Sequence, residues 1–259
     1  MNKDIKRIHK ECVEWIRNWF AENGPDCKAV IGISGGKDST VVAALCVEAL
    51  GVDRVVGVIM PNVIQDDFDD AEKVCEILDI TYLVMDIGTA FHSILNKFTY
   101  ATAGLTMSEQ SKINLPPRIR MATLYAVSQS VNGRVANTCN LSEEYIGYST
   151  RWGDNVGDFS PLGCLTKTEV VGLGIEMGLP NYLVTKTPSD GLCGKTDEDN
   201  FGFTYDELDE YLRTGEYENE ETKEKIDNLH NKNKFKQMDC IPTYCPFKEA
   251  KIIDYRKIK

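Results

Sequence analysis

Short apolar runs rich in β-branched residues alternate with longer stretches of helix-forming residues through the first half of the chain. Continuous apolar runs of this length are typical of strands buried on both faces of a parallel sheet. The predicted strands cover residues 29–33, 54–60, 81–87 and 134–138. The predicted helices before and between them cover residues 4–20, 41–50, 66–78 and 89–98. This alternation predicts an α/β fold with a doubly wound parallel sheet.

The rest of the chain carries clearer signals for helix ends than for strands. Residues 101–115 are polar and lack a clear period, which predicts a surface loop. Pro116 and Pro117 then predict the first turn of the next helix, where proline is well tolerated. Residues 216–236 are highly charged and predict a helix with a mostly solvated face. Two capping boxes predict further helix starts, pairing Thr166 with Glu169 and Thr204 with Glu207.

Length, charge and cysteine use narrow the class of protein. A chain of 259 residues suits one large domain, and we expect residues 1–259 to form it. The formal net charge of -11 argues against a general nucleic-acid or membrane surface, because both are anionic. No apolar run is long enough to span a bilayer, and the charged N-terminus is unlike a signal peptide. The nine scattered cysteines include no C-x-x-C pair, which indicates reduced thiols in a cytoplasmic protein.

The first motif that indicates chemistry is the run GISGGKDS, residues 32–39. It joins an apolar strand to a helix through a glycine turn, so free backbone N–H groups and the positive helix end can face a phosphate. Asp38 adds an oxygen ligand suited to a magnesium ion carried on phosphates. The glycine spacing differs from that of the common GxxxxGK[ST] loop. The run resembles instead the pyrophosphate loop of the N-type ATP pyrophosphatases, which are adenine-nucleotide α-hydrolase-like proteins.

A second informative region follows the last predicted strand and narrows the resemblance. Residues 138–154 read TCNLSEEYIGYSTRWGD, and further blocks follow over residues 161–169, 186–192, 196–199 and 205–209. In this order they resemble ammonia-dependent NAD synthetases, from about Ile5 to Lys236. The resemblance implies ATP-dependent amidation of deamido-NAD by ammonia through an NAD-adenylate, giving NAD, AMP and pyrophosphate. It also implies that the long loop over residues 187–203 is a lid over the ATP site.

The resemblance assigns roles to individual residues of this chain. ATP would contact Gly32, Ile33, Ser34, Gly35, Gly36, Lys37, Asp38, Ser39, Thr138, Lys167 and Ser189. Deamido-NAD would contact Arg118, Arg151, Asp158, Asn233 and Lys234. Magnesium would be held by Asp38 and Glu143, and the catalytic set would be Asp38, Glu143 and Lys167.

Several positions depart from the family pattern. Arg151 replaces a typical lysine and Ser189 a frequent threonine, so charge and hydroxyl are kept. Asn233 stands where a histidine often precedes Lys234, and asparagine cannot be protonated. Residues 155–157 also replace a glycine pair of the family, which leaves the shape of that loop open.

Two alternative functions and two further expectations accompany this hypothesis. A sulfur-inserting tRNA enzyme would share the glycine loop but should have paired cysteines and a basic surface. A non-catalytic nucleotide-binding module would leave Glu143 and Lys167 unexplained.

We expect a symmetric homodimer, for which the apolar run over residues 121–127 could supply helix surface. We also expect the chain to use free ammonia and not glutamine, because the matching blocks leave no room for a glutamine-hydrolysing domain.

Overall fold

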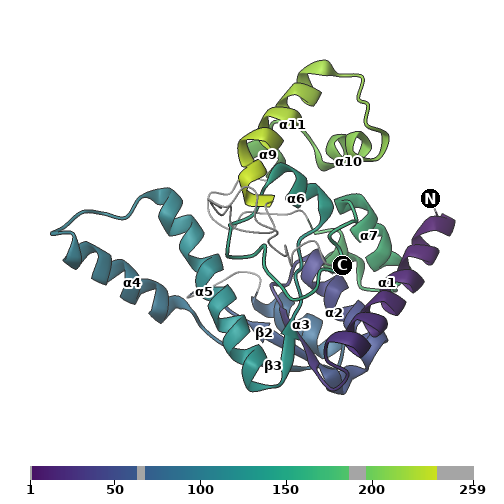
Figure 1. Ribbon diagram of the computed structural model, residues 1–259, viewed down its shortest axis with the longest axis horizontal. Helices are drawn as coiled ribbons and strands as arrows, with labels where there is room; N and C mark the ends of the chain where they lie inside the picture. The colour runs from purple at the N-terminus through teal and green to yellow at the C-terminus, as the bar shows by residue number, and fades with distance from the viewer. Residues whose placement is uncertain (1, 63–67, 187–196, 238–259) are drawn as a thin grey trace, which may run out of the picture.

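The computed structural model describes residues 2–62, 68–186 and 197–237. Its centre is a four-stranded parallel sheet in the order β3-β2-β1-β4 (Figure 1). The strands are β1 (Lys28–Gly32), β2 (Val55–Ile59), β3 (Thr81–Val84) and β4 (Gly133–Val135). A parallel bridge between Ala136 and Phe159 extends the edge beyond β4. The predicted α/β fold with a doubly wound parallel sheet is confirmed.

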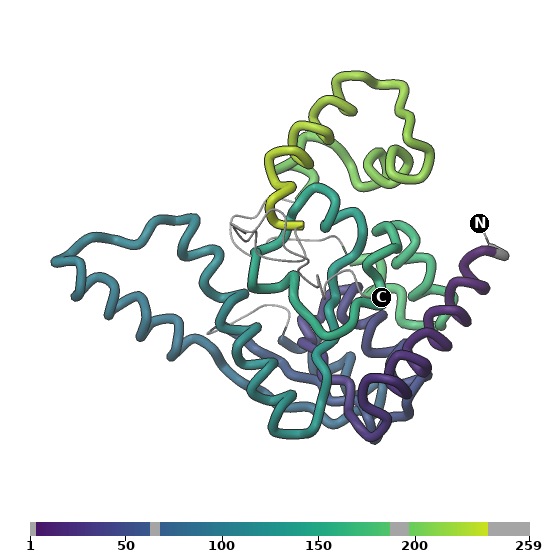
Figure 2. The backbone as a smooth tube through the Cα atoms, viewed as in Figure 1, coloured from purple at the N-terminus to yellow at the C-terminus, as the bar shows by residue number. Residues whose placement is uncertain are grey.

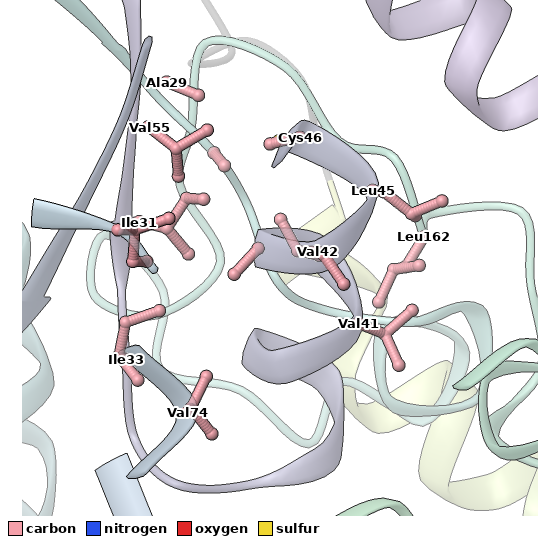
Figure 3. Packing of buried hydrophobic residues seen from close by; sticks show 14 of the residues in the cluster. Ala29, Ile31, Ile33, Val41, Val42, Leu45, Cys46, Val55, Val74 and Leu162 are labelled. Atoms are coloured by element: carbon pink, nitrogen blue, oxygen red, sulfur yellow. The ribbon is translucent and has the colours of Figure 1, made fainter. Parts of the chain in front are cut away.

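Alternate residues of the central strands enter two separate cores, as the period of two along a strand requires. Ala29 and Ile31 of β1 lie in the larger core, with α1, α2, α3 and α7, whereas Val30 lies in the smaller core beneath α5. Figure 3 shows the larger core where Ile31 and Val55 face Val42 of α2. Helices therefore cover both faces of the central strands β1 and β2, which are apolar on both sides.

Helices make up the rest of the described chain. Those around the sheet are α1 (Asn2–Asn23), α2 (Lys37–Leu50), α3 (Phe68–Ile77), α4 (Gly88–Ala101), α5 (Glu109–Ser130), α7 (Lys167–Glu176) and α8 (Asn181–Val184). Those above the sheet are α6 (Leu141–Ile146), α9 (Asp197–Phe201), α10 (Tyr205–Thr214) and α11 (Glu220–Asn233). Short 3-10 turns cover Val52–Arg54 and Lys234–Gln237.

Helices α9, α10 and α11 form a unit, here named the cap, that stands over α6 and α7 (Figure 1). Its small core consists of Phe203, Tyr205, Leu208 and Ile226 packed around Ile146 of α6. This core contains more aromatic rings than the sheet cores, and Phe201 contacts the rings of Phe203, Tyr205 and Tyr148. The cap is therefore attached to the body of the protein through α6, the helix that follows β4.

The prediction of a loop over residues 101–115 is wrong for its second part. Helix α5 begins at Glu109, where Ser108 caps it by accepting a hydrogen bond from the Ser111 backbone N–H at 3.3 Å. Pro116 and Pro117 lie inside this helix instead of starting it. Each proline removes one backbone N–H from the helical ladder, and the other residues of this 22-residue helix retain enough bonds for it to continue. In Figure 2 α4 and the first part of α5 project from the body as a hairpin.

The other element predictions hold, with shifted ends. Helix α2 begins four residues earlier than predicted, at Lys37. Both capping boxes are present, and Gly215 ends α10 in the left-handed conformation with a φ of 74°. Three helices of the described ranges were missed: α6 lies in the predicted ligand loop, α8 lies where no element was predicted, and α9 occupies part of the predicted lid over residues 187–203. The remainder of that lid, residues 187–196, lies outside the described residues.

The order of the strands defines where ligands can bind. From β1 the chain crosses to β2 and then β3, and it returns past β1 to form β4 on the other side. The loops after β1 and β4 therefore leave the sheet in opposite directions, which opens a crevice at the carboxyl ends of these strands. The glycine loop follows β1 and α6 follows β4.

Candidate functional site

The loop after β1 is closed by its own side chains. Gly35 has a φ of 77°, a conformation that favours glycine. The Ser39 hydroxyl donates to the Gly36 carbonyl at 3.1 Å and accepts from the Ser34 backbone N–H at 3.3 Å. Helix α2 begins directly after Gly36, which offers no side chain as a cap. The first N–H groups of α2 have no partner within the helix, so this end is built to meet an anion.

The loop after β4 brings a second helix start to the same place. The Asn140 side chain caps α6 by accepting from the Glu143 backbone N–H at 3.1 Å. The same side chain donates through Nδ2 to Oδ1 of Asp38 at 2.9 Å. Asp38 lies in the first turn of α2 and Glu143 in the first turn of α6, so two carboxylates meet between two helix N-termini.

Lys167 joins this pair of acids from the start of α7. Its Nζ donates to Oε1 of Glu143 at 2.5 Å, and its side chain is 5% exposed. The ammonium also lies over the ring of Tyr205, 4.3 Å from the centroid, which is a favourable cation–π distance. The Tyr205 hydroxyl donates to Asp197 at 3.1 Å, so the cap supplies one wall of the site.

The charges of these groups shift each other's pKa values. Burial, and then the negative charge of Asp38, raise the pKa of Glu143 to about 7 although Lys167 opposes the change. Burial lowers the pKa of Lys167, but the carboxylates of Glu143 and Asp38 outweigh it, so its pKa lies above the usual value. Lys37 is also buried, and burial and the charge of Lys167 lower its pKa. The site thus gathers cations suited to phosphate oxygens beside carboxylates suited to a metal ion.

The residues predicted to hold magnesium fit a cation that also binds phosphate. Asp38 and Glu143 offer hard carboxylate oxygens, and each has one oxygen held by a protein donor, from Asn140 and Lys167 respectively. Within the described part of the chain, no group of three or more His, Cys, Asp or Glu side chains could hold a metal ion. Two carboxylates alone leave most ligand positions of Mg²⁺ to phosphate oxygens and water, the usual arrangement for this ion.

Two of the residues assigned to deamido-NAD, Arg118 and Arg151, are in contact. Arg118 donates through Nε to the Arg151 carbonyl at 3.3 Å. The Arg151 guanidinium lies between two rings, 5.0 Å from the centroid of Trp152 and 5.8 Å from that of Phe235. Its Nε is buried without a hydrogen-bond partner, so a donor is available for a ligand. Asp158 stands apart from them, because its Oδ2 accepts from the Val135 backbone N–H at 2.7 Å.

The two residues predicted at the end of α11 have different surroundings. Asn233 donates to the Ile146 carbonyl at 2.9 Å and ties α11 to the end of α6. Lys234 is exposed. Lys236, which the sequence did not single out, donates to the carbonyls of Gly147 and Ser149 at 2.7 and 3.1 Å.

The structure thus brings together residues 32–39, Glu143 and Lys167, while Thr138 lies half-buried just before the Asn140 cap. Ser189 lies outside the described residues. Sequence reasoning missed the side-chain roles of Asn140, Tyr205 and Asp197, although each lies in a segment that carried the family resemblance. The sequence did carry a signal for Asn140, because asparagine is a favoured helix cap and Glu143 follows it three positions later.

Comparison with known proteins identifies the family. The sequence profile described as NAD synthase matches residues 8–242. The chain belongs to this family. The NH(3)-dependent NAD(+) synthetase of Carboxydothermus hydrogenoformans is 39% identical over 215 residues, which cover 80% of this chain and 86% of that protein.

Solved structures agree with the family assignment. The NMN synthetase of Francisella tularensis superposes with a TM-score of 0.83 at 33% identity, covering 92% of this chain and 98% of that one. The NH3-dependent NAD synthetase of Campylobacter jejuni has a TM-score of 0.73 at 29% identity, covering 93% and 98%. The predicted family and ligase class are confirmed, and neither the tRNA-modifying enzyme nor the non-catalytic module is supported.

Proposed function

We propose that this protein amidates deamido-NAD with ammonia at the expense of ATP, giving NAD, AMP and pyrophosphate. The observation that carries the proposal is the meeting of two helix N-termini, at Lys37 and Leu141, around the Asp38, Glu143 and Lys167 side chains. This arrangement suits a substrate with several phosphates and a bound cation. The NH(3)-dependent NAD(+) synthetases that the chain resembles support the choice of reaction.

In the first step the nicotinate carboxylate attacks the α-phosphorus of ATP. A P–O bond to the carboxylate forms, the bond to the β-phosphate oxygen breaks, and pyrophosphate leaves with its electron pair. Residues 32–39 would cradle the phosphates at the start of α2, with Lys37 and Lys167 neutralising charge that develops on the leaving group. Asp38 and Glu143 would hold Mg²⁺, which supplies further neutralisation when bound.

In the second step ammonia attacks the activated carbonyl carbon and AMP leaves, so the amide of NAD forms. Neutral ammonia is the nucleophile, and one of its protons is lost as the amide forms. The chain's contribution is to hold the adenylate and to exclude water from it, since water would return the acid. Buried groups around the site, such as Tyr205 and Asp197, restrict solvent on the side of the cap.

We assign the pyridine-nucleotide end of the substrate to the Arg118 and Arg151 pair. The free Nε of Arg151 could donate to a phosphate or carboxylate oxygen, and stacking on Trp152 holds the guanidinium in place. Asp158, Asn233 and Lys234 stay in the proposed set. Of these, Lys234 is exposed and Asn233 already binds the Ile146 carbonyl.

The test is product analysis of the purified chain with deamido-NAD, ATP and Mg²⁺. With ammonium as nitrogen donor we expect NAD and pyrophosphate in equal amounts, at a rate that rises from about pH 7 to about pH 9 as ammonium loses a proton to become ammonia. With ammonia-free glutamine we expect no NAD. Comparable turnover with glutamine would overturn the predicted nitrogen source, and pyrophosphate release without NAD would overturn the amidation itself.

A second candidate is amidation of the shorter substrate, nicotinate mononucleotide, to give NMN. The specific observation that favours it is the high structural similarity to the NMN synthetase of Francisella tularensis. Both substrates present the same carboxylate, so the activation chemistry is unchanged and only recognition of the adenylyl half differs. Competing equal amounts of the two acids and measuring the ratio of NAD to NMN gives the ratio of their kcat/KM values.

We also propose that the protein is a homodimer. Large apolar side chains are exposed on β3 and along the projecting α4–α5 hairpin, where Tyr100 is 86% and Leu105 is 61% exposed. The run over residues 121–127 contributes less surface than the sequence suggested, because Val127 is buried and Leu124 packs against the sheet. Light scattering should give twice the chain mass, and a monomer with full activity would contradict the proposal.

Finally, we propose that the chain is one domain and works in the cytoplasm. The six cysteines of the described ranges are free thiols, as a reducing compartment favours. No helix in those ranges is long and apolar enough to cross a membrane. Cooperative thermal unfolding followed by calorimetry would test the single domain, and fractionation of the native cells would test the compartment.

A further inference from the structure

The Asn140 side chain lies between the two acids proposed to hold magnesium. It is fully buried, and its two ends face different elements. The oxygen accepts from the backbone N–H of Glu143, in the first turn of α6. The nitrogen donates to Asp38 in the first turn of α2, a residue 102 positions earlier in the chain. One amide therefore connects the helix starts that form the site.

Chemistry fixes which way round this amide lies. A backbone N–H can only donate, so the group that faces Glu143 must be the oxygen. The amide nitrogen then faces Asp38, whose ionised carboxylate can only accept. Both contacts are satisfied in one orientation and neither is satisfied in the other. The orientation of Asn140 thus follows from its partners.

Helix capping alone does not require asparagine at this position. Aspartate and serine cap helices about as well as asparagine, because each offers an oxygen to the first N–H groups. Neither could replace the contact with Asp38: a carboxylate would repel it, and a serine hydroxyl is too short to span both partners. The requirement for an amide therefore arises from Asp38 and not from the helix.

We propose that Asn140 is a positioning residue that orients the Asp38 carboxylate for the metal–phosphate complex and fixes its place relative to Glu143. The inference rests on the proposed function. The hydrogen bond from the amide to Oδ1 prevents free rotation of the Asp38 carboxylate. The other carboxylate oxygen therefore keeps a fixed direction. Ordering of a ligand carboxylate by a neighbouring hydrogen bond strengthens metal binding and turnover about 10- to 100-fold in metal sites generally.

Asn219 offers a matched control. It caps α11 in the same way, accepting from the backbone N–H groups of Glu221 and Thr222 at 3.1 and 3.3 Å. It lies in the cap, directly before α11, and its side chain and carbonyl both accept hydrogen bonds from the first turn of that helix. Serine at either position keeps a good cap, whereas only Asn140→Ser removes the donor to Asp38.

The experiment measures binding of magnesium pyrophosphate by calorimetry and amidation kinetics for wild type, Asn140→Ser and Asn219→Ser. For Asn140→Ser we expect affinity for magnesium pyrophosphate to fall about tenfold or more, with a similar fall in kcat. The KM for deamido-NAD should change little, because Asn140 is not among the residues proposed to bind deamido-NAD. Asn219→Ser should match wild type in both measurements.

A second measurement guards against simple misfolding. Thermal unfolding of Asn140→Ser and Asn219→Ser should show for each a single cooperative transition well above the assay temperature, because serine keeps the helix cap at both positions. Wild-type kcat and pyrophosphate affinity in Asn140→Ser would overturn the inference. If wild type made no NAD, the proposed function would fail, and the calorimetric comparison would still decide the role of Asn140.

Discussion

The body and the cap are held together by different forces. The body has a large aliphatic core in which side chains from β1, β2 and five of the described helices interlock, with Leu45 and Ile31 fully buried. The cap has a small aromatic core that also encloses Ile146 of the body, and it meets the body through polar contacts as well. Asp209 of α10 accepts from the Ser142 hydroxyl and from the backbone N–H and hydroxyl of Thr168. Aliphatic packing supplies stability in the body, whereas the cap's polar contacts set the positions of catalytic groups.

The difference matters because the body and the cap together position the same three side chains, those of Asp38, Glu143 and Lys167. Asp38 is placed by the body, through β1 and the glycine loop. Glu143 and Lys167 follow helix starts that the cap also touches, since the Ser142 hydroxyl accepts from the Lys167 backbone N–H at 3.0 Å. A change in the body core should therefore affect unfolding more than turnover, and a change in the polar contacts of the cap should affect both.

The largest effect should come from the acids where body and cap meet. Asp38→Asn and Glu143→Gln each remove a negative charge from the metal–phosphate site while keeping side-chain size. We expect each to lower pyrophosphate release by about 100-fold or more, with native circular dichroism retained. Near-normal rates at saturating magnesium would show that these carboxylates do not hold the metal.

The body alone is tested by Leu45→Ala. Leu45 is fully buried and lies beside Leu162, on the side of α2 that faces away from the strand residues (Figure 3), so truncation leaves a cavity in the larger core. The free energy of unfolding in urea should fall by about 3 kcal/mol. Turnover measured well below the unfolding temperature should stay near that of wild type, and a large drop in kcat there would contradict the division between body and cap.

The polar contact between cap and body is tested by Asp209→Asn. The change leaves one acceptor where Ser142 and Thr168 supply three donors, so unfolding free energy should fall by about 2 kcal/mol. We also expect kcat to fall several-fold, because Lys167 loses part of its support. The control is Asp227→Asn, whose partner is the Tyr211 hydroxyl within the cap, at 2.9 Å. Equal kcat values for the two variants would argue against a positioning role for Asp209.

The smallest effect concerns a surface ion pair between α10 and α7. Burial alone would raise the pKa of Glu169, but hydrogen bonds from Arg213 and from the Thr166 backbone outweigh it and lower the pKa. A lowered carboxylate pKa adds stability above the ordinary value of 4.5, and this is lost as the pH falls below it. Glu169→Gln keeps the capping box, so it should lower stability by only about 0.5 kcal/mol at neutral pH, since Arg213 is 44% exposed.

The contribution of the Glu169–Arg213 ion pair is measured by chemical unfolding of wild type and Glu169→Gln over a range of pH. The difference in unfolding free energy should shrink toward zero as the pH falls below 4.5, because Glu169 then becomes neutral in wild type as well. A difference that is the same at all pH values would mean that the glutamate charge contributes nothing to the contact.

Local signals in the sequence predicted elements of both the body and the cap, but not the contacts between them. Strands such as β1 and β2 are short β-branched runs, and the capping box formed by Thr204 and Glu207 predicts the start of α10. Pro116 and Pro117 gave a misleading signal, because proline is common at a helix start and here lies within one. The polar turn of α6 resembled a loop for a similar reason, since Asn, Ser and Glu suit both.

The side-chain contacts of the site could not be derived from any local pattern. Ser142 and Asp209 are 67 positions apart, and no spacing rule connects them. The resemblance named Asp38, Glu143 and Lys167, whereas the link from Asn140 to Asp38 appears only once β1 and β4 lie side by side. The motifs therefore predicted which residues belong to the site. The contacts between those residues became apparent only from the fold.

The proline pair inside α5 has a mechanical consequence. Because Pro116 and Pro117 lack N–H groups, the carbonyls one turn earlier, at Lys112 and Ile113, receive no helical hydrogen bond from them. Deuterium exchange should therefore divide α5, with slow exchange in the part that packs under the sheet and faster exchange in the projecting part. Although α5 is one continuous helix in the structure, it would then behave as two segments joined at a flexible point.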